Sequence, residues 1–273
     1  MENKLIETAI NAALVAGDVI MEVYSTGKFG IGIKLDLSPL TIADKRAHIT
    51  IKEILSGTGL PILSEEEKAT AYKYRKDWDY YWLVDPLDGT KEFIKKNGEF
   101  TVNIALIHKG RPLLGVVYVP VTNMLYFGSE QTGTRRIDSK VLDKKQSGLE
   151  ELLTKSVKLT GDRINRGFTI IASRSHLNIK TMRIINRLKK KYGEVEYLCK
   201  GSSLKFCMLA EGLADIYPRF HPTMEWDTAA GQSLVEFSGG LVFQADNGLP
   251  IEYNKEKLVN PYFIACRDIK DIG

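Results

Sequence analysis

Two aspartates three positions apart follow directly on an apolar segment, and this stretch most constrains how the chain folds. Residues 80–84, Tyr-Tyr-Trp-Leu-Val, contain no Gly or Pro and predict a short buried strand. The strand leads into the turn 85–90, Asp-Pro-Leu-Asp-Gly-Thr, where Pro86 keeps Asp85 extended and Gly89 permits a tight backbone. Gathered carboxylates repel one another unless a divalent cation lies between them, and oxygen ligands favour Mg²⁺ or Mn²⁺. The stretch predicts a metal-binding corner at a sheet edge, although the same residue types also occur in ordinary loops.

The composition is that of an ordinary soluble globular chain of 273 residues, 44% hydrophobic and 26% charged. This length is enough for one large core or two packed lobes, and no linker rich in Ser, Gly and Pro divides it. The formal charge of +4, from 38 basic and 34 acidic residues, would help attract an anionic substrate. It is far from the concentrated basic face of a protein that binds a nucleic-acid polymer.

Cysteines, histidines and apolar runs narrow the compartment and the type of metal. Cys199, Cys207 and Cys266 form no C-x-x-C pair, which favours a reducing compartment. The four histidines lack metal-ligand spacing, so no zinc site is predicted. No stretch resembles a signal peptide or reaches transmembrane length, so we predict a cytoplasmic protein without a transmembrane segment. Peripheral association with the inner membrane and the oligomeric state stay open.

Apolar periodicity predicts the elements of the first half of the chain. Residues 5–24 carry apolar side chains at three- and four-residue intervals, which is typical of a helix packed on a core. Thr41 suits the N-cap of a second helix over residues 42–55. Asp44 lies in the first turn of that helix, where a carboxylate either complements the helix dipole or takes a chemical role. Strands of a largely antiparallel sheet are predicted at 60–63, 100–108, 113–119, 125–127 and 135–141, with a short helix at 90–96.

Strands alternate with helices in the second half, which favours layered α/β packing. The predicted strands are residues 168–172, 195–198, 214–217, 241–244 and 262–265, and the predicted helices are residues 177–192, 204–213 and 226–237. A lobe boundary is predicted near the polar stretch 140–152. This boundary gives an N-terminal α+β lobe, residues 1–155, and a C-terminal α/β lobe, residues 156–273.

A second acidic stretch, residues 225–231, reads Glu-Trp-Asp-Thr-Ala-Ala-Gly and starts a predicted helix with small residues that permit a close approach. By itself it also fits an N-cap Asp followed by a helix packed on a sheet. No Walker A loop, Rossmann glycine fingerprint or G-x-S-x-G elbow occurs. Together, Ser64-Glu65-Glu66, residues 85–90 and residues 226–231 resemble the inositol monophosphatase superfamily of metal-dependent, lithium-sensitive phosphatases. The stretches 81–106, 173–176, 201–207 and 217–220 are similar to its branch of bacterial 3'(2'),5'-bisphosphate nucleotidases.

The resemblance implies a fold and an activity. The implied fold is a layered α/β/α/β/α sandwich of the inositol monophosphatase and fructose bisphosphatase type, with a mainly antiparallel first sheet. The implied activity is hydrolysis of adenosine 3',5'-bisphosphate (PAP) to AMP and phosphate with two or three Mg²⁺ ions, and the sulfated analogue PAPS is a further candidate substrate. A phosphatase for inositol, sugar or polyol phosphates is the alternative. A sensor that binds the nucleotide without cleaving it is disfavoured, because every expected ligand and Thr90 is present.

The resemblance also implies site residues, with the metal site in the first lobe and nucleotide-binding elements in the second. The implied metal ligands are Glu65, Asp85, the backbone carbonyl of Leu87, Asp88 and Asp227. The implied catalytic residues are Asp44, Thr90 and Glu65; a threonine hydroxyl is a poor base, so Thr90 requires Asp44 to accept the proton from the attacking water. The implied substrate contacts are Gly89, Thr90, Ser173, His176, Gly201, Lys205, Arg219 and Asp227. Lys205 and the amides of residues 201–203 would bind the second phosphate.

Overall fold

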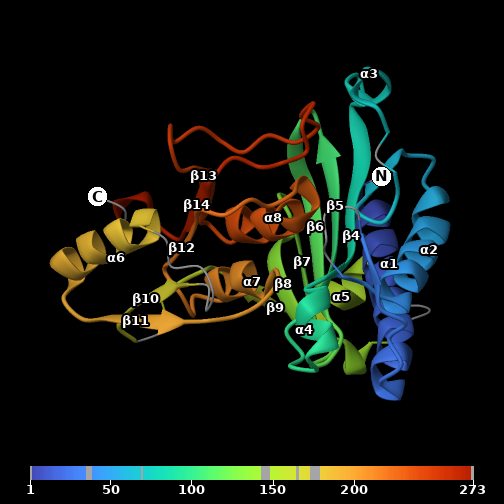
Figure 1. The fold of residues 1–273 in the computed structure, drawn as a ribbon, viewed down its shortest axis with the longest axis horizontal. Coiled ribbons are helices and arrows are strands. Elements are labelled where there is room, and N and C mark those ends of the chain that lie inside the picture. Colours follow the sequence, from blue (N-terminus) through green and yellow to red (C-terminus); the bar gives the residue numbers. More distant parts are fainter. Residues whose placement is uncertain are drawn as a thin grey trace.

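Helices and sheets alternate in five layers (Figure 1). The structure is a computed structural model that describes residues 2–34, 39–68, 70–142, 148–163, 166–172 and 179–271. The layers are a pair of long helices, a seven-stranded sheet, two buried helices, a five-stranded sheet and a last helix. This order confirms the predicted α/β/α/β/α sandwich.

The first two layers are built from the N-terminal half. Helices α1 (Glu2–Thr26) and α2 (Ile42–Ser56) cover one face of the larger sheet and share a hydrophobic core with it. The strand order in this sheet is β3-β4-β5-β6-β7-β8-β9, where β3 and β4 run parallel and every other pair is antiparallel. The strands are β3 (Ile62–Ser64), β4 (Tyr80–Asp88), β5 (Thr101–His108), β6 (Arg111–Val119), β7 (Met124–Ser129), β8 (Gly133–Asp138) and β9 (Val157–Leu159).

The remaining layers come from the C-terminal half. Helices α7 (Leu204–Ala210) and α8 (Ala229–Phe237) lie between the two sheets, and α6 (Ile179–Tyr192) covers the outer face of the smaller sheet (Figure 1). The order of the smaller sheet is β11-β10-β12-β14-β13, with β10 parallel to β11 and β12 and the other pairs antiparallel. Its strands are β10 (Phe168–Ile171), β11 (Val195–Leu198), β12 (Ile216–Arg219), β13 (Leu241–Gln244) and β14 (Phe263–Cys266).

Small residues allow α8 to lie close against β6. A Cβ atom added to Gly115 would lie 1.8 Å from the Ser233 Oγ and 2.7 Å from the Ala230 carbonyl oxygen. On the other side of the helix, a Cβ on Gly231 would lie 2.3 Å from the Phe206 ring. The close approach predicted from the small residues after Asp227 is therefore confirmed, and it fixes α8 between the sheets.

Some elements differ from the sequence predictions. The helix predicted over residues 226–237 is a 3₁₀ turn, η2 (Glu225–Asp227), followed by α8, because Thr228 between them has a non-helical φ of −121°. The end of the strand predicted over 135–141 is the 3₁₀ turn η1 (Ser139–Val141). The hydrophobic pattern does not predict α3 (Tyr72–Arg75), α5 (Leu149–Lys155) or β9. Since β9 extends the larger sheet and α8 contacts both sheets, the lobe boundary at residue 155 stays a prediction.

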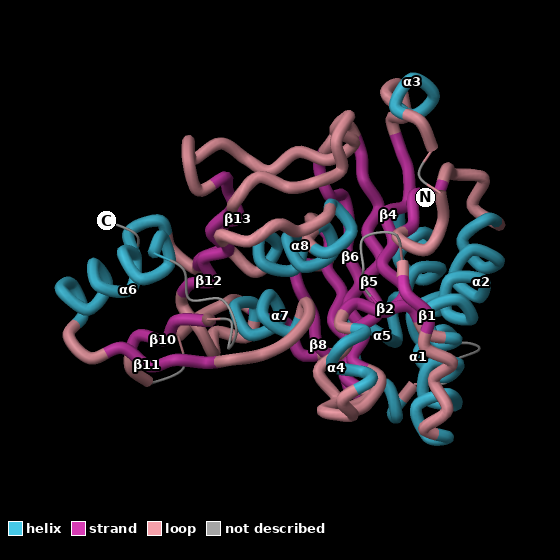
Figure 2. The backbone as a smooth tube through the Cα atoms, in the orientation of Figure 1, coloured by secondary structure: helices cyan, strands magenta, loops and turns pink. Residues whose placement is uncertain are grey.

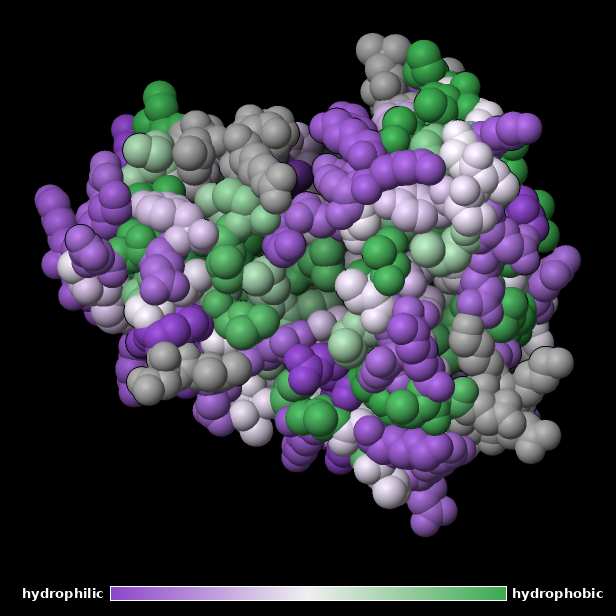
Figure 3. Space-filling view, turned by 90° about the horizontal axis from the view of Figure 1, so that it is seen from below, coloured by the Kyte–Doolittle hydropathy of each residue, from purple (hydrophilic) through white to green (hydrophobic). Residues whose placement is uncertain are grey.

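The N-terminal half also contains a two-stranded sheet. Strands β1 (Gly32–Ile33) and β2 (Pro39–Leu40) form an antiparallel pair that lies near the short helix α4 (Thr90–Ile94) (Figure 2). Hydrophilic side chains are spread over the face of the molecule shown in Figure 3. None of the helices in the described part of the chain combines the length and the apolar character of a membrane-spanning segment.

Candidate active site

The end of β4 carries the two aspartates of the predicted metal corner. The pairing of β4 with β5 is irregular between Asp85 and Asp88, and the Leu87 N–H donates to the Asp85 Oδ1 at 3.1 Å. Gly89 follows with a φ of +96°, and a Cβ there would lie 3.0 Å from the Glu99 carbonyl oxygen. Only glycine suits both this conformation and this space. The sharp turn places the acids at the sheet edge, as predicted.

The four carboxylates implied as metal ligands lie close enough for their negative charges to repel one another. Asp85 is 1% exposed, and burial together with the charges of Glu65, Asp88 and Asp227 raises its pKa well above the usual range. Asp85 and Glu65 are close enough to share a hydrogen bond. Burial and the charge of Asp88 raise the pKa of Asp227 to about 8. These acids from three distant parts of the chain therefore converge on one region.

Each acid around Asp85 also has a protein partner. Glu65 accepts a hydrogen bond from the Lys34 ammonium at 2.7 Å, and the Asp227 Oδ2 accepts the Met224 N–H at 2.8 Å. Across the described residues, no three Asp, Glu, His or Cys side chains close around a point where a cation could be held. The donor set nevertheless fits a hard cation, because it consists of oxygens and leaves the buried Asp85 carboxylate beside three other acids.

Asp44 and Thr90 meet beside this group. The Thr90 hydroxyl donates to the Asp44 Oδ1 at 3.0 Å, and Thr41 donates to the Asp44 Oδ2 through its N–H at 2.7 Å and its hydroxyl at 2.6 Å. Thr41 and Asp44 thus form the capping box of α2. Burial raises the pKa of Asp44, while its hydrogen bonds partly oppose that shift. Asp44 therefore completes the capping box of α2 and also accepts a hydrogen bond from Thr90, while its chemical role stays a prediction.

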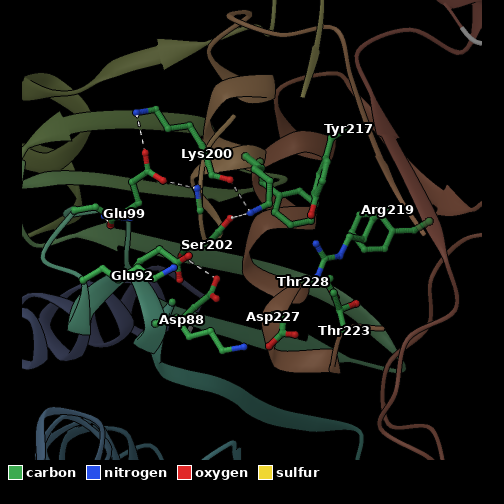
Figure 4. A pocket seen from close by; sticks show the side chains of 18 residues that line it. Asp88, Glu92, Glu99, Lys200, Ser202, Tyr217, Arg219, Thr223, Asp227 and Thr228 are labelled. Carbon is green, nitrogen blue, oxygen red and sulfur yellow. Dashed lines mark hydrogen bonds and ion pairs between the residues drawn. The ribbon is translucent and has the colours of Figure 1, made fainter. Parts of the chain in front are cut away.

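A cavity of about 560 Å³ opens beside Asp88 and Asp227, and both side chains point into it (Figure 4). Its walls come from the α4 region, the start of α7, β12 and η2. The lining residues are Asp88, Gly89, Lys91, Glu92, Lys95, Asn97, Glu99, Lys200, Gly201, Ser202, Lys205, Phe206, Tyr217, Arg219, Thr223, Asp227, Thr228 and Phe263. Five lysine and arginine side chains in these walls make the cavity suited to an anionic ligand.

The basic residues of this cavity are held in different ways. Lys205 is 8% exposed, and its ammonium donates to the Ser202 carbonyl at 2.6 Å and the Lys200 carbonyl at 3.3 Å. Burial lowers the pKa of Lys205 to about 8. The Arg219 Nε is buried without a hydrogen-bond partner among the described residues. Arg219 thus has a donor available to a ligand, whereas Lys205 supports the turn that precedes α7.

The Gly201 amide differs from its predicted state. Its N–H donates to the Glu99 Oε2 at 2.9 Å, and the Glu99 Oε1 lies 3.3 Å from the Lys200 ammonium. The Glu99 carboxylate therefore accepts the hydrogen bond of one of the amides predicted to bind phosphate (Figure 4). The implied contacts Ser173 and His176 lie outside the described residues.

Comparison with known proteins agrees with this geometry. Residues 1–267 match the sequence profile of the inositol monophosphatase family. The chain belongs to this family. It is 48% identical to CysQ from Bacteroides thetaiotaomicron, a bacterial family member whose crystal structure superposes with a TM-score of 0.89 over 97% of this chain and 98% of that one.

Two further relatives show which part of the inositol monophosphatase family this chain resembles. The 3'(2'),5'-bisphosphate nucleotidase CysQ of Shigella flexneri is 41% identical over 263 residues, which are 95% of this chain and 98% of the relative. The inositol monophosphatase of Anabaena is 22% identical with a TM-score of 0.70 over 98% of this chain and 92% of that one, so it shares the fold. The predicted resemblance to the nucleotidase branch is confirmed.

Several residues of the candidate site carry no sequence signal of their own. Thr101 and Asn103, at the start of β5, lie beside Asp88, and Glu99 reaches Gly201. Tyr217 and Thr228 line the cavity. In the sequence these residues belong to apolar strands or to turns, and the pairing of β4 with β5 and the packing of α7, α8 and β12 bring them to the site.

Proposed function

We propose that this chain is a Mg²⁺-dependent phosphatase that hydrolyses adenosine 3',5'-bisphosphate to AMP and phosphate, with PAPS as a further substrate. The observation that carries the proposal is the Thr90 to Asp44 hydrogen bond beside the converging carboxylates Glu65, Asp85, Asp88 and Asp227. The nucleotidase name of the Shigella flexneri relative at 41% identity supports the choice of substrate, and the relative at 48% identity carries the same protein name, CysQ.

Five groups would hold two or three Mg²⁺ ions in this proposal. They are the carboxylates of Glu65, Asp85, Asp88 and Asp227 and the backbone carbonyl of Leu87. When bound, the ions neutralise the phosphoryl oxygens, lower the pKa of a water and stabilise the leaving oxygen. The protein's share is to hold the buried Asp85 rigidly at the end of β4, where the Leu87 N–H fixes one of its oxygens.

Asp44 and Thr90 would move the proton of the attacking water. The nearer acceptor for the Thr90 hydroxyl is the Asp44 Oδ1 at 3.0 Å, against 3.4 Å for the Leu87 carbonyl, and a hydroxyl that donates there keeps its lone pairs for a hydrogen bond from water. The raised pKa of Asp44 makes this carboxylate a stronger base than an exposed aspartate. Glu65, the third implied catalytic residue, lies beside Asp85.

The nucleotide would lie in the 560 Å³ cavity next to the carboxylates. The buried Arg219 Nε is a donor for the second phosphate, and Lys205 adds positive charge at the cavity wall. Gly89, Thr90, Gly201 and Asp227 complete the proposed contacts among the described residues, and Ser173 and His176 belong to the same proposal. Binding of phosphate at Gly201 would require the Glu99 carboxylate to leave the amide.

Turnover of matched substrates tests the proposal. Phosphate release from PAP, PAPS and inositol monophosphate is measured with Mg²⁺, and Asp88→Asn is the inactive control. We expect PAP to be the best substrate by kcat/KM. A preference for inositol phosphate would assign the chain to the alternative polyol branch, and equal background from wild type and Asp88→Asn with all substrates would indicate a nucleotide sensor.

A further inference from the structure

The Asp88 carboxylate is surrounded by hydroxyl groups that each have a second acceptor. The Asp88 Oδ2 accepts hydrogen bonds from the Ser202 hydroxyl at 2.9 Å, the Ser203 hydroxyl at 3.0 Å and the Asn103 amide at 3.3 Å. Three donors on one oxygen compensate a carboxylate whose neighbours are also acidic. The same oxygen is one that a cation bound to Asp88 could take.

The Ser202 hydroxyl has an alternative to Asp88. Its oxygen lies 2.5 Å from the Thr101 Oγ1, and either oxygen can be the donor. The Thr101 hydroxyl lies 2.9 Å from the Asn103 Oδ1. Each hydroxyl has one hydrogen, so two patterns are available. In one, Thr101 donates to Ser202 and Ser202 donates to Asp88; in the other, Ser202 donates to Thr101 and Thr101 donates to Asn103.

The Ser203 hydroxyl also has a second acceptor besides Asp88. It lies 3.0 Å from the Asp88 Oδ2 and 3.2 Å from the Asp227 backbone carbonyl, and it can donate to only one of them at a time. The Asn103 amide donates to the Ser203 oxygen at 2.9 Å in either case. Both serines can therefore release Asp88 by rotating a hydrogen, without movement of any heavy atom and without an unsatisfied donor.

We propose that Ser202 and Ser203 are exchangeable donors that bind Asp88 in the absence of a cation and turn to Thr101 and the Asp227 carbonyl when a divalent cation takes the carboxylate oxygen. The inference rests on the proposed role of Asp88 as a metal ligand. It makes Thr101 a positioning residue, because its oxygen is the acceptor that allows Ser202 to leave Asp88. It also ties the Gly201 to Ser203 turn of the nucleotide cavity to the metal-binding corner.

The proposal predicts opposite effects on Mn²⁺ affinity for substitutions of Thr101 and Ser202. Thr101→Val removes the second acceptor, so the Ser202 hydrogen stays on Asp88 and competes with the cation. We expect the dissociation constant for Mn²⁺ to rise about tenfold, which is about 1.4 kcal/mol. Ser202→Ala removes the competitor, so Mn²⁺ should bind as tightly as in wild type or more tightly. In the double variant, the Thr101→Val penalty should disappear.

The experiment is a double-mutant cycle on Mn²⁺ binding, read from the electron paramagnetic resonance signal of the free ion. Thr134→Val is the matched control, because Thr134 is also fully buried in the larger sheet and its hydroxyl donates to the Leu234 carbonyl away from the site. Thr101→Ser keeps the hydroxyl and should restore wild-type binding. Thr101→Ala replaces Thr101→Val if the valine variant does not fold.

The outcomes separate this inference from the proposed function. A Thr101→Val penalty that is absent, or that persists unchanged in the Ser202→Ala background, would overturn the exchange while leaving Asp88 as a ligand. Equal Mn²⁺ binding by wild type and Asp88→Asn would remove Asp88 from the metal site. That result would overturn both the exchange and the metal part of the proposed function.

Discussion

The Thr90 hydroxyl donates to the Asp44 Oδ1 across 3.0 Å, although the two residues are 46 positions apart in the chain. Thr90→Val removes this donor and the oxygen that would receive the proton from water. We expect kcat to fall by about 10² to 10⁴. Thr90→Ser keeps the hydroxyl and should retain most of the activity.

The capping role of Asp44 requires a separate control. Thr41→Ala removes the side-chain cap of α2 but leaves the Asp44 to Thr90 bond in place. We expect it to lower the free energy of unfolding by about 1 kcal/mol and to retain most of kcat. A Thr90→Val enzyme with nearly wild-type kcat would contradict the proposed proton transfer.

Asp85 should destabilise the protein when no cation is present, because it is buried among like charges. Asp85→Asn cannot ionise, so it removes the cost of charging or protonating this buried carboxyl and lets the amide donate to Glu65. In the presence of a chelator, we expect its free energy of unfolding to exceed that of wild type by about 1 kcal/mol. Mg²⁺ should raise the melting temperature of wild type but not of this variant. Melting curves with and without Mg²⁺ measure both effects.

Asp215 provides the matched control for Asp85, since it is also a fully buried aspartate. Its carboxylate is paired with the Arg163 Nε at 2.8 Å and the Arg166 Nη1 at 2.6 Å. Asp215→Asn breaks a buried ion pair and should cost about 3 to 5 kcal/mol. If both substitutions changed stability in the same direction, the repulsion assigned to Asp85 would be wrong.

Lys205 predicts how nucleotide binding depends on pH. Burial lowers its pKa to about 8, so the ammonium form dominates below pH 8 and is lost above it. The affinity for AMP measured by calorimetry with Mg²⁺ should therefore fall by up to about tenfold between pH 7 and pH 9. Lys205→Met should bind AMP more weakly at pH 7 and show a flatter pH profile. An equally steep profile in the variant would rule out Lys205 as the titrating group.

The same shift has a consequence for stability. A lysine titrates near 10.5 when the chain is unfolded and near 8 in the folded protein, so the unfolded state binds more protons between these values. The stability contributed by this group is full above pH 10.5 and is lost as the pH falls toward 8. Wild type should therefore lose stability between pH 10.5 and pH 8 through this group, whereas Lys205→Met should lack this contribution, which denaturant unfolding at several pH values can measure.

The features that were predicted correctly from the sequence depend on the local chemistry of turns and helix caps. Pro86 and Gly89 determine the backbone around Asp85 and Asp88, and Thr41 with Asp44 forms a capping box within four residues. These features depend on neighbouring residues, so they can be read without the fold. The side-chain partners of Asp88 depend on strand pairing and could not be read in this way.

The elements that escaped prediction are stabilised by distant contacts. Helix α5 buries only Leu149 and Leu152, and its first amide donates to Glu7 on α1 at 2.6 Å. Arg75 on α3 is 2% exposed and donates to the Asn254 side chain at 2.7 Å and the Lys255 carbonyl at 2.7 Å. The sequence does not show that the first amide of α5 reaches Glu7. It also does not show whether a basic residue such as Arg75 is exposed or buried, so neither contact could be predicted.

Close packing of α8 on β6 predicts a large effect of a single methyl group. Gly115→Ala would place a Cβ 1.8 Å from the Ser233 Oγ and 2.7 Å from the Ala230 carbonyl, so the helix must move. We expect a loss of about 1 to 3 kcal/mol in the free energy of unfolding. Asp227 lies two residues before the start of this helix, so the Mg²⁺ concentration for half-maximal activity should rise as well.

Gly57→Ala is the matched substitution at a site with space. Gly57 has a helical backbone, with φ −60° and ψ −13°, and its Cβ would lie 3.4 Å from the Ile54 carbonyl. There the methyl group restricts the unfolded chain without a clash, so stability should rise by about 0.4 to 1 kcal/mol. Equal effects of the two substitutions in urea unfolding would mean that α8 can shift away from β6 freely. Asp227 would then depend on its hydrogen bond with Met224, and not on the docked helix, for its position.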